Sequence, residues 1–327
     1  MYDIVTFGEA MIRLSPPNFR RLEQATSFDV HAGGGEFNVA VAGARMGLKT
    51  AWVSKLPDNP LGRLVRNTAR QYGVSTDHIV WSKEGRAGIY YLEFGGAPRA
   101  SSVVYDRAHS SISMIKTREV DWNSLFEGCK AFHVSGITPA LSASAAEVTF
   151  EAIRAAKRKG AKVSYDLNYR AKLWTEDEAR ACQEPMMEFV DILISTEEDT
   201  NRVFKITGPT YDDVAVQLAE KFKFEVVAIT LRENVSVWKN NWTAIAYADG
   251  KFYRDKTYEL EIVDRVGGGD SFTAGFLAGY LEEGVERGVK FGNALSALKH
   301  SIPGDINIST RDEVEKLLTT GGLRISR

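Results

Sequence analysis

The chain has 327 residues, of which 44% are hydrophobic, 26% charged and 10% aromatic, a composition that excludes a disordered or collagen-like protein. Lysine and arginine number 41 against 43 acidic residues, which gives a formal net charge of −2, and the basic residues are scattered along the sequence. Because a nucleic-acid-binding protein usually shows a basic excess or stripe, we expect no nucleic-acid partner.

The cysteines and the N-terminal residues indicate a reducing, non-membrane environment. Cys129 and Cys182 lie far apart and belong to no CxxC or Cys/His spacing, so neither a disulfide framework nor a structural zinc site is expected. The start of the chain lacks the basic and apolar regions of a signal peptide, and the longest mostly apolar stretch, 272–281, is too short to span a bilayer. These features predict a soluble cytoplasmic protein without a membrane partner.

Short β-branched runs alternate with stretches of helical period through most of the sequence. In chain order the pattern predicts a strand at 3–9, a helix at 38–47 ended by Gly47, a strand at 50–56, a helix at 61–73, a strand at 131–137, a helix at 145–160, a strand at 161–167, a helix at 175–190, a strand at 191–195 and a helix at 197–208. Strands separated by helices form βαβ units with right-handed crossovers. We therefore expect an α/β fold with a central, mainly parallel sheet and helices on both of its faces.

Two segments interrupt this alternation. Residues from about 12–32 and 86–108 contain strand-like runs and no helix, which predicts a small antiparallel sheet beside the main one. The segments are either two surface hairpins or a lid over the carboxyl ends of the parallel strands, where α/β proteins bind ligands. A further β-meander is expected at 235–265.

The strongest local signal is the sequence VGGGD at 266–270, followed by a run of helical period that starts at Phe272. Three glycines at the start of a buried helix leave backbone N–H groups open to a phosphate or to a transferring phosphoryl group. The carboxylate of Asp270 beside them could take the proton from an attacking hydroxyl. The alternative is a glycine-rich turn with Asp270 as the helix N-cap. Gly275 and Gly279 would let this helix lie close to a neighbouring one.

A second glycine cluster, GGGEFN at 33–38, precedes the first predicted helix. Gly34 would let a sugar approach the backbone, and Asn38 would hydrogen-bond to sugar hydroxyls. The alternative is a loop whose glycines serve only its tight geometry.

Together these segments resemble the ribokinase/PfkB family of carbohydrate kinases along nearly the whole chain. The resemblance rests on Gly8-Glu9 after the first strand, GGGEFNVA at 33–40, DLNYR at 166–170, STEE at 195–198 and VGGGDSFTAGF at 266–276. It implies a single ribokinase-like α/β domain over residues 1–327, with the lid strands inserted in it and a homodimer or higher homo-oligomer formed through the lid. The sequence departs from the family pattern at Ser195, where asparagine is usual, and after Thr230, where a common glycine is absent.

The resemblance also implies roles for particular residues. Asp270 would activate the sugar hydroxyl as a general base, and Gly267, Gly268 and Gly269 would form the anion hole. ATP would lie along residues of several segments: Asn168, Arg170, Ser195, Thr230, Arg232, Gly267, Gly269 and Asn293. Magnesium would bridge phosphate oxygens, with Glu198 reaching it through water, and a monovalent cation such as K⁺ is a further expected cofactor.

Segments 103–113, 166–170 and 263–270 are similar to the 2-keto-3-deoxygluconate kinase branch of the family. This similarity implies a sugar-acid pocket lined by Gly34, Asn38, Tyr90, Tyr105, Arg107, Arg170 and Asp270. A guanidinium binds a carboxylate bidentately, whereas a neutral hexose carries no such charge. The alternative is that Arg107 pairs with Asp106 and that Arg170 serves only ATP phosphate.

The implied reaction transfers the γ-phosphoryl group of ATP to the terminal hydroxyl of 2-keto-3-deoxygluconate (2-dehydro-3-deoxy-D-gluconate) and gives its 6-phosphate. Within the family, fructokinase, ribokinase and nucleoside kinase activities are alternatives. A catalytically silent, sugar-sensing regulator on the same fold would have no need of Asp270. An NAD-dependent oxidoreductase is disfavoured because no GxGxxG motif follows the first predicted strand, and the chain lacks a Walker-type GxxxxGK[ST] loop as well.

Overall fold

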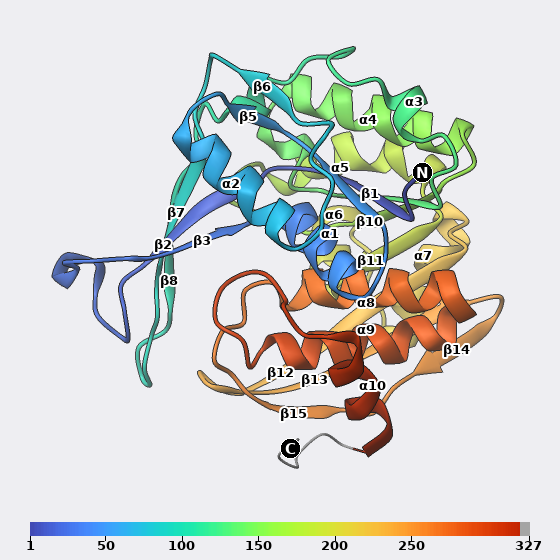
Figure 1. The fold of residues 1–327 in the computed structure, drawn as a ribbon. Helices are drawn as coiled ribbons and strands as arrows, with labels where there is room; N and C mark the ends of the chain where they lie inside the picture. The colour runs from blue at the N-terminus through green and yellow to red at the C-terminus, as the bar shows by residue number, and fades with distance from the viewer. Residues whose placement is uncertain (321–327) are drawn as a thin grey trace.

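The computed structural model describes residues 1–320, and its largest element is a nine-stranded sheet (Figure 1). Six neighbouring strands run parallel, in the order β12 (Val226–Ser236), β11 (Ile192–Ser195), β10 (Lys162–Asp166), β9 (Ala131–Ser135), β1 (Ile4–Phe7) and β4 (Thr50–Val53). The expected meander extends the β12 edge with three antiparallel strands, β13 (Lys239–Ala248), β14 (Lys251–Arg254) and β15 (Tyr258–Glu261). The predicted central, mainly parallel sheet is confirmed.

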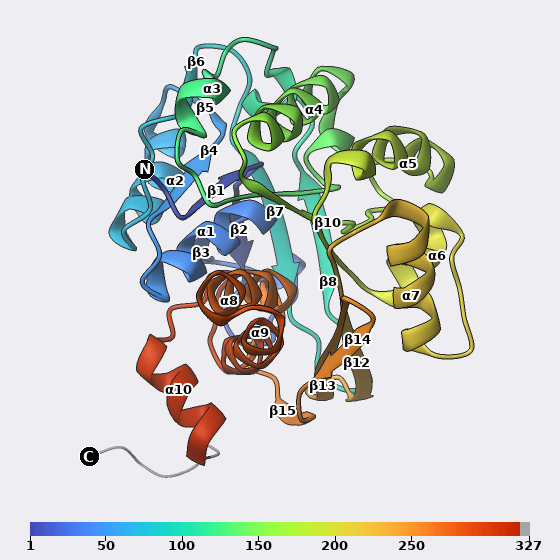
Figure 2. The same cartoon turned by 90° about the vertical axis from the view of Figure 1, so that its right-hand side faces the viewer.

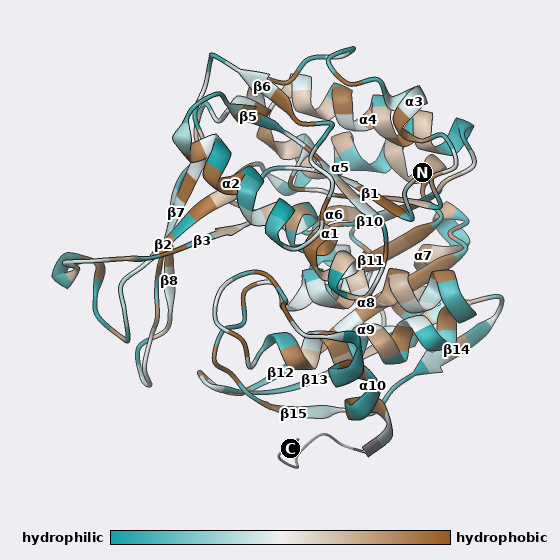
Figure 3. Cartoon of the chain, viewed as in Figure 1, coloured by the Kyte–Doolittle hydropathy of each residue, from teal (hydrophilic) through white to brown (hydrophobic). Residues whose placement is uncertain are grey.

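Helices cover both faces of this sheet (Figure 2). One face carries α1 (Gly35–Arg45), α8 (Gly268–Glu283) and α9 (Val285–Lys299), and the other carries α4 (Ala143–Arg158), α5 (Glu176–Gln183), α6 (Glu197–Phe204) and α7 (Tyr211–Phe222). Successive side chains of a strand point to opposite faces. Ile4 therefore packs in one cluster with Phe272 of α8, whereas Val5 packs in another with Val148 of α4. Burial on both faces explains why the central strands are hydrophobic along their length (Figure 3).

The close approach predicted for the glycine-rich helix is confirmed. Helices α8 and α9 lie side by side, and a Cβ at Gly275 would lie 2.8 Å from the Cα of Gly292 on α9. A Cβ at Gly279 would lie 2.7 Å from the carbonyl oxygen of Arg287. Any larger side chain at these positions would push the two helices apart.

A separate four-stranded sheet, which we call the lid sheet, projects from the body of the molecule (Figure 1). Its strands lie in the order β3 (Asp29–Gly33), β2 (Met11–Ser15), β7 (Gly88–Glu93) and β8 (Ser102–Asp106). The outer pairs β3–β2 and β7–β8 are antiparallel hairpins, but β2 and β7 run parallel, so the prediction of a wholly antiparallel sheet was wrong. The chain passes through α1 and the main sheet between β2 and β7, and this long crossover allows the parallel pairing.

Several predicted boundaries also differ from the structure. The strand predicted at 50–56 is divided at Ser54 into β4 and β5 (Lys55–Pro57), and β5 pairs with β6 (Val80–Ser82) in a small two-stranded sheet. Helix α5 stops at Gln183 and continues as a 3₁₀ turn because Pro185 cannot extend it. The remaining helices are α2 (Pro60–Gln71), α3 (Trp122–Leu125) and α10 (Arg311–Thr320). Short 3₁₀ turns lie at Leu22–Gln24, Ser111–Met114, Pro139–Leu141 and Glu184–Phe189. The first of these turns lies in a segment predicted to contain no helix.

Two other sequence-based expectations concern chemistry and the membrane. Cys129 and Cys182 are both free thiols, as expected. Among residues 1–320, no helix has both the length and the apolar character needed to cross a bilayer.

Candidate active site

A cavity of about 650 Å³ lies at the carboxyl ends of the parallel strands, beneath the lid sheet. Asp166 ends β10, Ser195 ends β11 and Glu9 follows β1, so these side chains reach the cavity from neighbouring strands. The residues predicted from sequence that line it are Gly34, Asn38, Tyr90, Tyr105, Arg107, Asn168, Arg170, Ser195, Glu198, Thr230, Arg232, Gly267, Gly268, Gly269 and Asp270. The fold thus brings nearly all of the predicted residues into one space.

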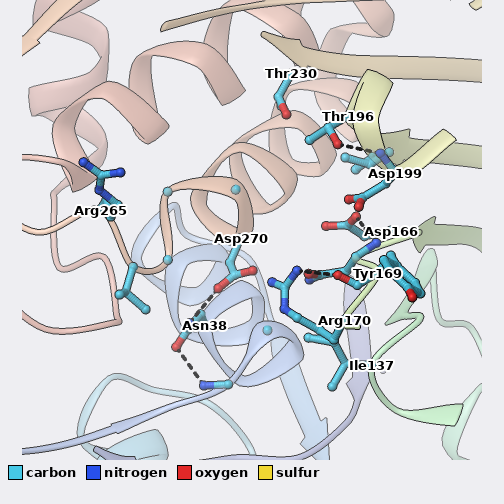
Figure 4. A pocket seen from close by; sticks show the side chains of 18 of the residues that line it. Asn38, Ile137, Asp166, Tyr169, Arg170, Thr196, Asp199, Thr230, Arg265 and Asp270 are labelled. Atoms are coloured by element: carbon cyan, nitrogen blue, oxygen red, sulfur yellow. Dashed lines mark hydrogen bonds between the residues drawn. The ribbon is translucent and has the colours of Figure 1, made fainter. Parts of the chain in front are cut away.

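Asp270 lies near the middle of this cavity, in the first turn of α8 (Figure 4). The N-cap of α8 is Gly267, whose φ of 83° favours glycine, so the alternative of Asp270 as N-cap was wrong. One carboxylate oxygen, Oδ2, accepts a 2.7 Å hydrogen bond from Asn38 Nδ2. The other oxygen, Oδ1, has no hydrogen-bond partner among residues 1–320 and lies 3.7 Å from the position that a Cβ of Gly35 would take. Oδ1 can therefore accept a hydrogen bond from a ligand that binds beside Gly35.

The environment of Asp270 makes its carboxylate more basic than usual. Burial raises the pKa of Asp270 to about 6, while the Asn38 hydrogen bond and the nearby charges of Arg170 and Lys299 act in the opposite direction. A carboxylate with a pKa near the working pH can accept a proton and still be ionised in most molecules at neutral pH. This property suits a general base.

The turn before α8 has open backbone N–H groups. The amides of Gly269 and Asp270 find no acceptor among residues 1–320, because the first turn of a helix has no preceding carbonyls to pair with. Gly269 has nothing within 4 Å of its missing Cβ, whereas a Cβ at Gly268 would lie 2.7 Å from the His300 ring, and one at Gly267 would collide with the Asp305 carbonyl. Gly269 therefore faces the cavity, and the other two glycines permit close packing behind it.

The two glycines before α1 differ in what they permit. A Cβ at Gly34 would collide with the carbonyl oxygen of Glu9, so the missing side chain serves packing. A Cβ at Gly35 would point toward Asp270, Asn168 and Ser135 without touching them closely. The open space that the sequence led us to expect at Gly34 thus lies at Gly35.

Aromatic and charged residues of the lid sheet line the sugar half of the cavity. The Tyr90 and Tyr105 rings lie 5.8 Å apart, and the Tyr90 hydroxyl donates to Asp305. Arg107 forms an ion pair with the buried Glu9, whereas Asp106 pairs with Arg86 at 2.6 Å, so the alternative pairing of Arg107 with Asp106 was wrong. Glu9 Oε1 and Arg107 Nε are buried without a partner among the described residues. The described residues therefore leave hydrogen-bonding capacity of this ion pair unused.

Carboxylates and an arginine line the other half of the cavity. Burial raises the pKa of Asp166, and the charges of Asp199 and Asp270 raise it further. Burial also raises the pKa of Asp199, while Arg170 lowers it. Figure 4 shows Arg170 between Asp166 and Asp270, where it can interact with a bound phosphate. A cation or phosphate-bound metal at this place would relieve the repulsion between these acids.

Asn293 and Glu198 were predicted to bind ATP and magnesium, but other residues of the chain already hold their side chains. Asn293 does not line the cavity: its Nδ2 donates to Asp255 Oδ2 at 2.8 Å and to the Lys256 carbonyl at 2.9 Å, which fixes the turn before β15. Glu198 does line the cavity but forms an exposed ion pair with Arg202 at 2.5 Å.

Within residues 1–320 no group of three or more His, Cys, Asp or Glu side chains is arranged to hold a metal ion.

Several acidic residues of the site had no role predicted from the sequence. Glu9 and Asp166 stand in the segments that carried the family resemblance, at the carboxyl ends of predicted strands, and that position was a usable signal. Asp199 lies one residue beyond the STEE segment. Asp305 lies in the loop between α9 and α10, and nothing in the local sequence marks it as part of the site.

Comparison with known proteins agrees with this geometry. Residues 1–312 match the model of the pfkB family of carbohydrate kinases. A 2-dehydro-3-deoxygalactonokinase of Haloferax volcanii is 40% identical over 99% of both chains. A crystal structure of 2-dehydro-3-deoxygluconokinase from Thermotoga maritima is 44% identical, covers 97% of this chain and 98% of that one, and superimposes with a TM-score of 0.94. A 5-dehydro-2-deoxygluconokinase of Bacillus licheniformis is 28% identical over 97% of this chain and 96% of its own.

The fold and the cavity are those of an enzyme that phosphorylates carbohydrates. The chain belongs to the pfkB family of carbohydrate kinases and has the ribokinase-like α/β fold, as the sequence predicted. Its substrate is a small sugar or sugar derivative.

Proposed function

We propose that this carbohydrate kinase transfers the γ-phosphoryl group of ATP to the terminal hydroxyl of 2-keto-3-deoxygluconate. The observation that carries the proposal is the Arg107 guanidinium, which lines the sugar half of the cavity, pairs with Glu9 through one nitrogen and keeps its Nε unpartnered among residues 1–320. A fixed guanidinium suits the carboxylate of a sugar acid and has no counterpart on a neutral hexose. Two relatives at 40% and 44% identity carry names of keto-deoxy sugar-acid kinases, which supports the same substrate class.

In the proposed reaction, the sugar hydroxyl donates a hydrogen bond to Asp270 Oδ1, the oxygen that Asn38 leaves free. As the hydroxyl oxygen attacks the γ-phosphorus, its proton passes to Asp270. The bond from the phosphorus to the β–γ bridging oxygen breaks, and ADP leaves. The open amides of Gly269 and Asp270 would stabilise the negative charge on the transferring oxygens.

ATP would occupy the half of the cavity opposite the lid. Thr230 and Arg232 of β12 line this half together with Arg265, and Figure 4 shows the Arg170 side chain beside Asp270. Guanidinium groups and open amides match the charge of a triphosphate. With its phosphates at the start of α8, the nucleotide would present its γ-phosphorus to a hydroxyl held at Asp270.

Magnesium would accompany ATP and neutralise charge on its phosphates. We assign it to the neighbourhood of Asp166 and Asp199, because both carboxyl groups have raised pKa values and neither forms an ion pair within 4 Å among residues 1–320. Glu198, which the family resemblance implied, would first have to give up its ion pair with Arg202.

The substrate proposal is tested by ADP release in the presence of ATP and Mg²⁺. The panel is 2-keto-3-deoxygluconate, 2-keto-3-deoxygalactonate, fructose, ribose and adenosine. The second keto acid is included because the Haloferax volcanii relative is named for it. We expect the keto acids to have the highest kcat/KM. A preference for fructose or ribose would contradict the sugar-acid proposal, and no turnover on any of them would favour a sugar-sensing regulator.

We further propose that two copies of this chain associate through the outer face of the lid sheet. Val30, Leu14, Tyr91 and Val104 are paired in register across the four strands and therefore point to the same face, opposite to Tyr90 and Tyr105. Val30 and Val104 are 52% and 51% exposed. A second copy would cover this apolar row. Light scattering should give twice the monomer mass for the wild type and a smaller mass for Val104→Glu; a monomeric wild type would contradict the proposal.

A further inference from the structure

Lys299, the last residue of α9, is a fully buried lysine that the proposed mechanism does not use. Its Nζ donates to the carbonyl oxygens of Ile302 at 2.9 Å and Asp264 at 3.3 Å. A Cβ at Gly267 would lie 3.4 Å from Lys299 Cε, so the side chain passes directly under the turn that begins α8. The ammonium therefore lies behind the open amides of Gly269 and Asp270.

The charges around Lys299 form a compact buried group. Arg13 of the lid sheet pairs with Asp264 at 2.7 Å and with Asp305 at 2.8 Å, and all three side chains are almost completely buried. The Asp264 carboxylate also accepts hydrogen bonds from the amides of Val266 and Gly304, both at 3.0 Å. Two cations and two carboxylates balance one another here. Loss of the Lys299 charge would leave a net negative charge beneath a site that must attract phosphate.

This arrangement bears on the monovalent cation that the family resemblance implied. Ions such as K⁺ are held by rings of oxygen ligands, and backbone carbonyls are typical ones. Beneath this turn, the carbonyl oxygens of Asp264 and Ile302 already face the Lys299 ammonium. A second cation at the same place would meet a like charge and would have to displace these contacts. The residues present at this turn therefore do not fit a bound monovalent cation.

Lys299 is also electrostatically linked to the proposed base. Burial lowers the pKa of Lys299 to about 8, with Arg13 acting in the same direction and Asp264, Asp305 and Asp270 opposing it. Lys299 is in turn one of the positive charges that lower the pKa of Asp270 against the effect of burial. A change at Lys299 should therefore alter the titration of Asp270.

We propose that Lys299 is a built-in cation for the anion hole: a positioning residue whose ammonium holds the Gly267 turn and supplies the positive charge that a bound monovalent ion would otherwise bring. It follows that phosphoryl transfer by this enzyme is independent of K⁺. The inference rests on the proposed reaction at the start of α8 but not on the identity of the sugar.

The first test uses the wild-type enzyme with whichever sugar of the panel supports turnover. Rates are compared in K⁺, Na⁺ and tetramethylammonium salts at the same ionic strength, with Mg²⁺ and ATP constant. We expect kcat to agree within about twofold, because the ammonium is covalently present. Stimulation of about tenfold or more by K⁺ would overturn the proposal. Absence of ADP from every sugar would instead count against the proposed function.

The second test is Lys299→Met, which removes the charge and keeps an unbranched side chain. Loss of an electrostatic contribution to the transition state should lower kcat by roughly 10- to 100-fold while KM for the sugar changes little. The acid limb of the pH profile should move to higher pH, since Asp270 loses a stabilising charge, and K⁺ or NH₄⁺ should restore part of the rate.

Lys290→Met is the matched control, because Lys290 lies on the same helix but is exposed and pairs with Glu286 at 2.6 Å. It should keep the wild-type kcat, KM and pH profile. A folded Lys299→Met enzyme with wild-type kcat and pH profile would overturn the proposal. If that variant does not fold, the salt comparison on the wild type still decides the question.

Discussion

Asn38 Nδ2 donates a 2.7 Å hydrogen bond to Asp270 Oδ2, across 232 positions of sequence. This contact joins the starts of α1 and α8, and with them the two glycine clusters that the sequence presents separately. Because Asn38 Oδ1 also accepts from the Gly34 amide at 3.3 Å, its side chain cannot rotate freely. The Asp270 carboxylate is thereby held with one oxygen toward the sugar half of the cavity.

Replacing Asn38 with alanine should therefore disturb the base without removing it. We expect Asn38→Ala to lower kcat by roughly 10-fold and to shift the acid limb of the pH profile upward, because a hydrogen bond that stabilises the ionised carboxylate is lost. Steady-state kinetics from pH 5 to pH 9 would measure both effects. Asn67→Ala, at an exposed position of α2, is the control, and an unchanged pH profile for Asn38→Ala would contradict the assigned role.

The pH dependence of the wild type follows from the raised pKa of Asp270. The base acts in its ionised form, so kcat/KM should increase as the pH rises through about 6 and then level off until Lys299, whose pKa is lowered by burial to about 8, loses its charge. An unperturbed aspartate would give a limb near pH 4, as its ordinary pKa is about 3.9. A pH–rate profile at sugar concentrations well below KM, with saturating ATP and constant Mg²⁺, measures kcat/KM and would show which value applies. An acid limb near 4 would mean that the cavity is more hydrated than the structure indicates.

Arg107 should discriminate between charged and neutral substrates. Removing a charge-assisted hydrogen bond costs about 1.5–3 kcal/mol, so Arg107→Ala should lower kcat/KM for the keto acid by roughly 10- to 100-fold. The activity on a neutral sugar should fall less. Arg86→Ala is a close control, because Arg86 pairs with the neighbouring Asp106 and does not line the cavity. Equal losses on both kinds of sugar in Arg107→Ala would show that this arginine does not bind a carboxylate.

Arg13 connects the lid sheet to the turn before α8, and its replacement should affect stability strongly. Arg13→Met leaves the buried carboxylates of Asp264 and Asp305 without their shared partner, which typically costs about 3–5 kcal/mol. Urea unfolding would measure the change in the free energy of unfolding. The exposed Arg20→Met should change it by less than about 0.5 kcal/mol. A similarly small effect at Arg13 would mean that the lid sheet and the α8 turn are not coupled through this residue.

The parts of the fold that could be predicted are those with a local physical signal. Strands buried on both faces are unbroken apolar runs, and helices between them have helical period, so the parallel sheet followed from the sequence. The two glycine clusters, with Asn38 and Asp270, could be found because they stand where a predicted helix begins, whereas the other site residues were implied by the family resemblance. Asn293 shows the limit of the resemblance: it was expected to bind ATP, but its amide turns toward Asp255 and it does not line the cavity.

The interactions that could not be predicted join residues distant in sequence. Arg107 and Glu9 are 98 positions apart, and Arg13 and Asp305 are 292 apart. Nothing in the sequence indicates these pairings, and only the fold shows that the residues are buried and joined. Lys299 likewise resembles a basic residue at an exposed helix end until α8 and α9 are seen to pack together. The parallel pairing of β2 with β7 was missed for the same reason.

The most direct test of the proposed mechanism is the turnover of Asp270→Asn. Asparagine keeps the size of the side chain and can still accept the hydrogen bond from Asn38, but it cannot take a proton. We expect kcat to fall by roughly 10²- to 10⁴-fold, while the affinity for ATP, measured by titration without sugar, stays within about twofold of the wild type. Turnover close to that of the wild type would remove Asp270 from the chemistry and contradict the mechanism.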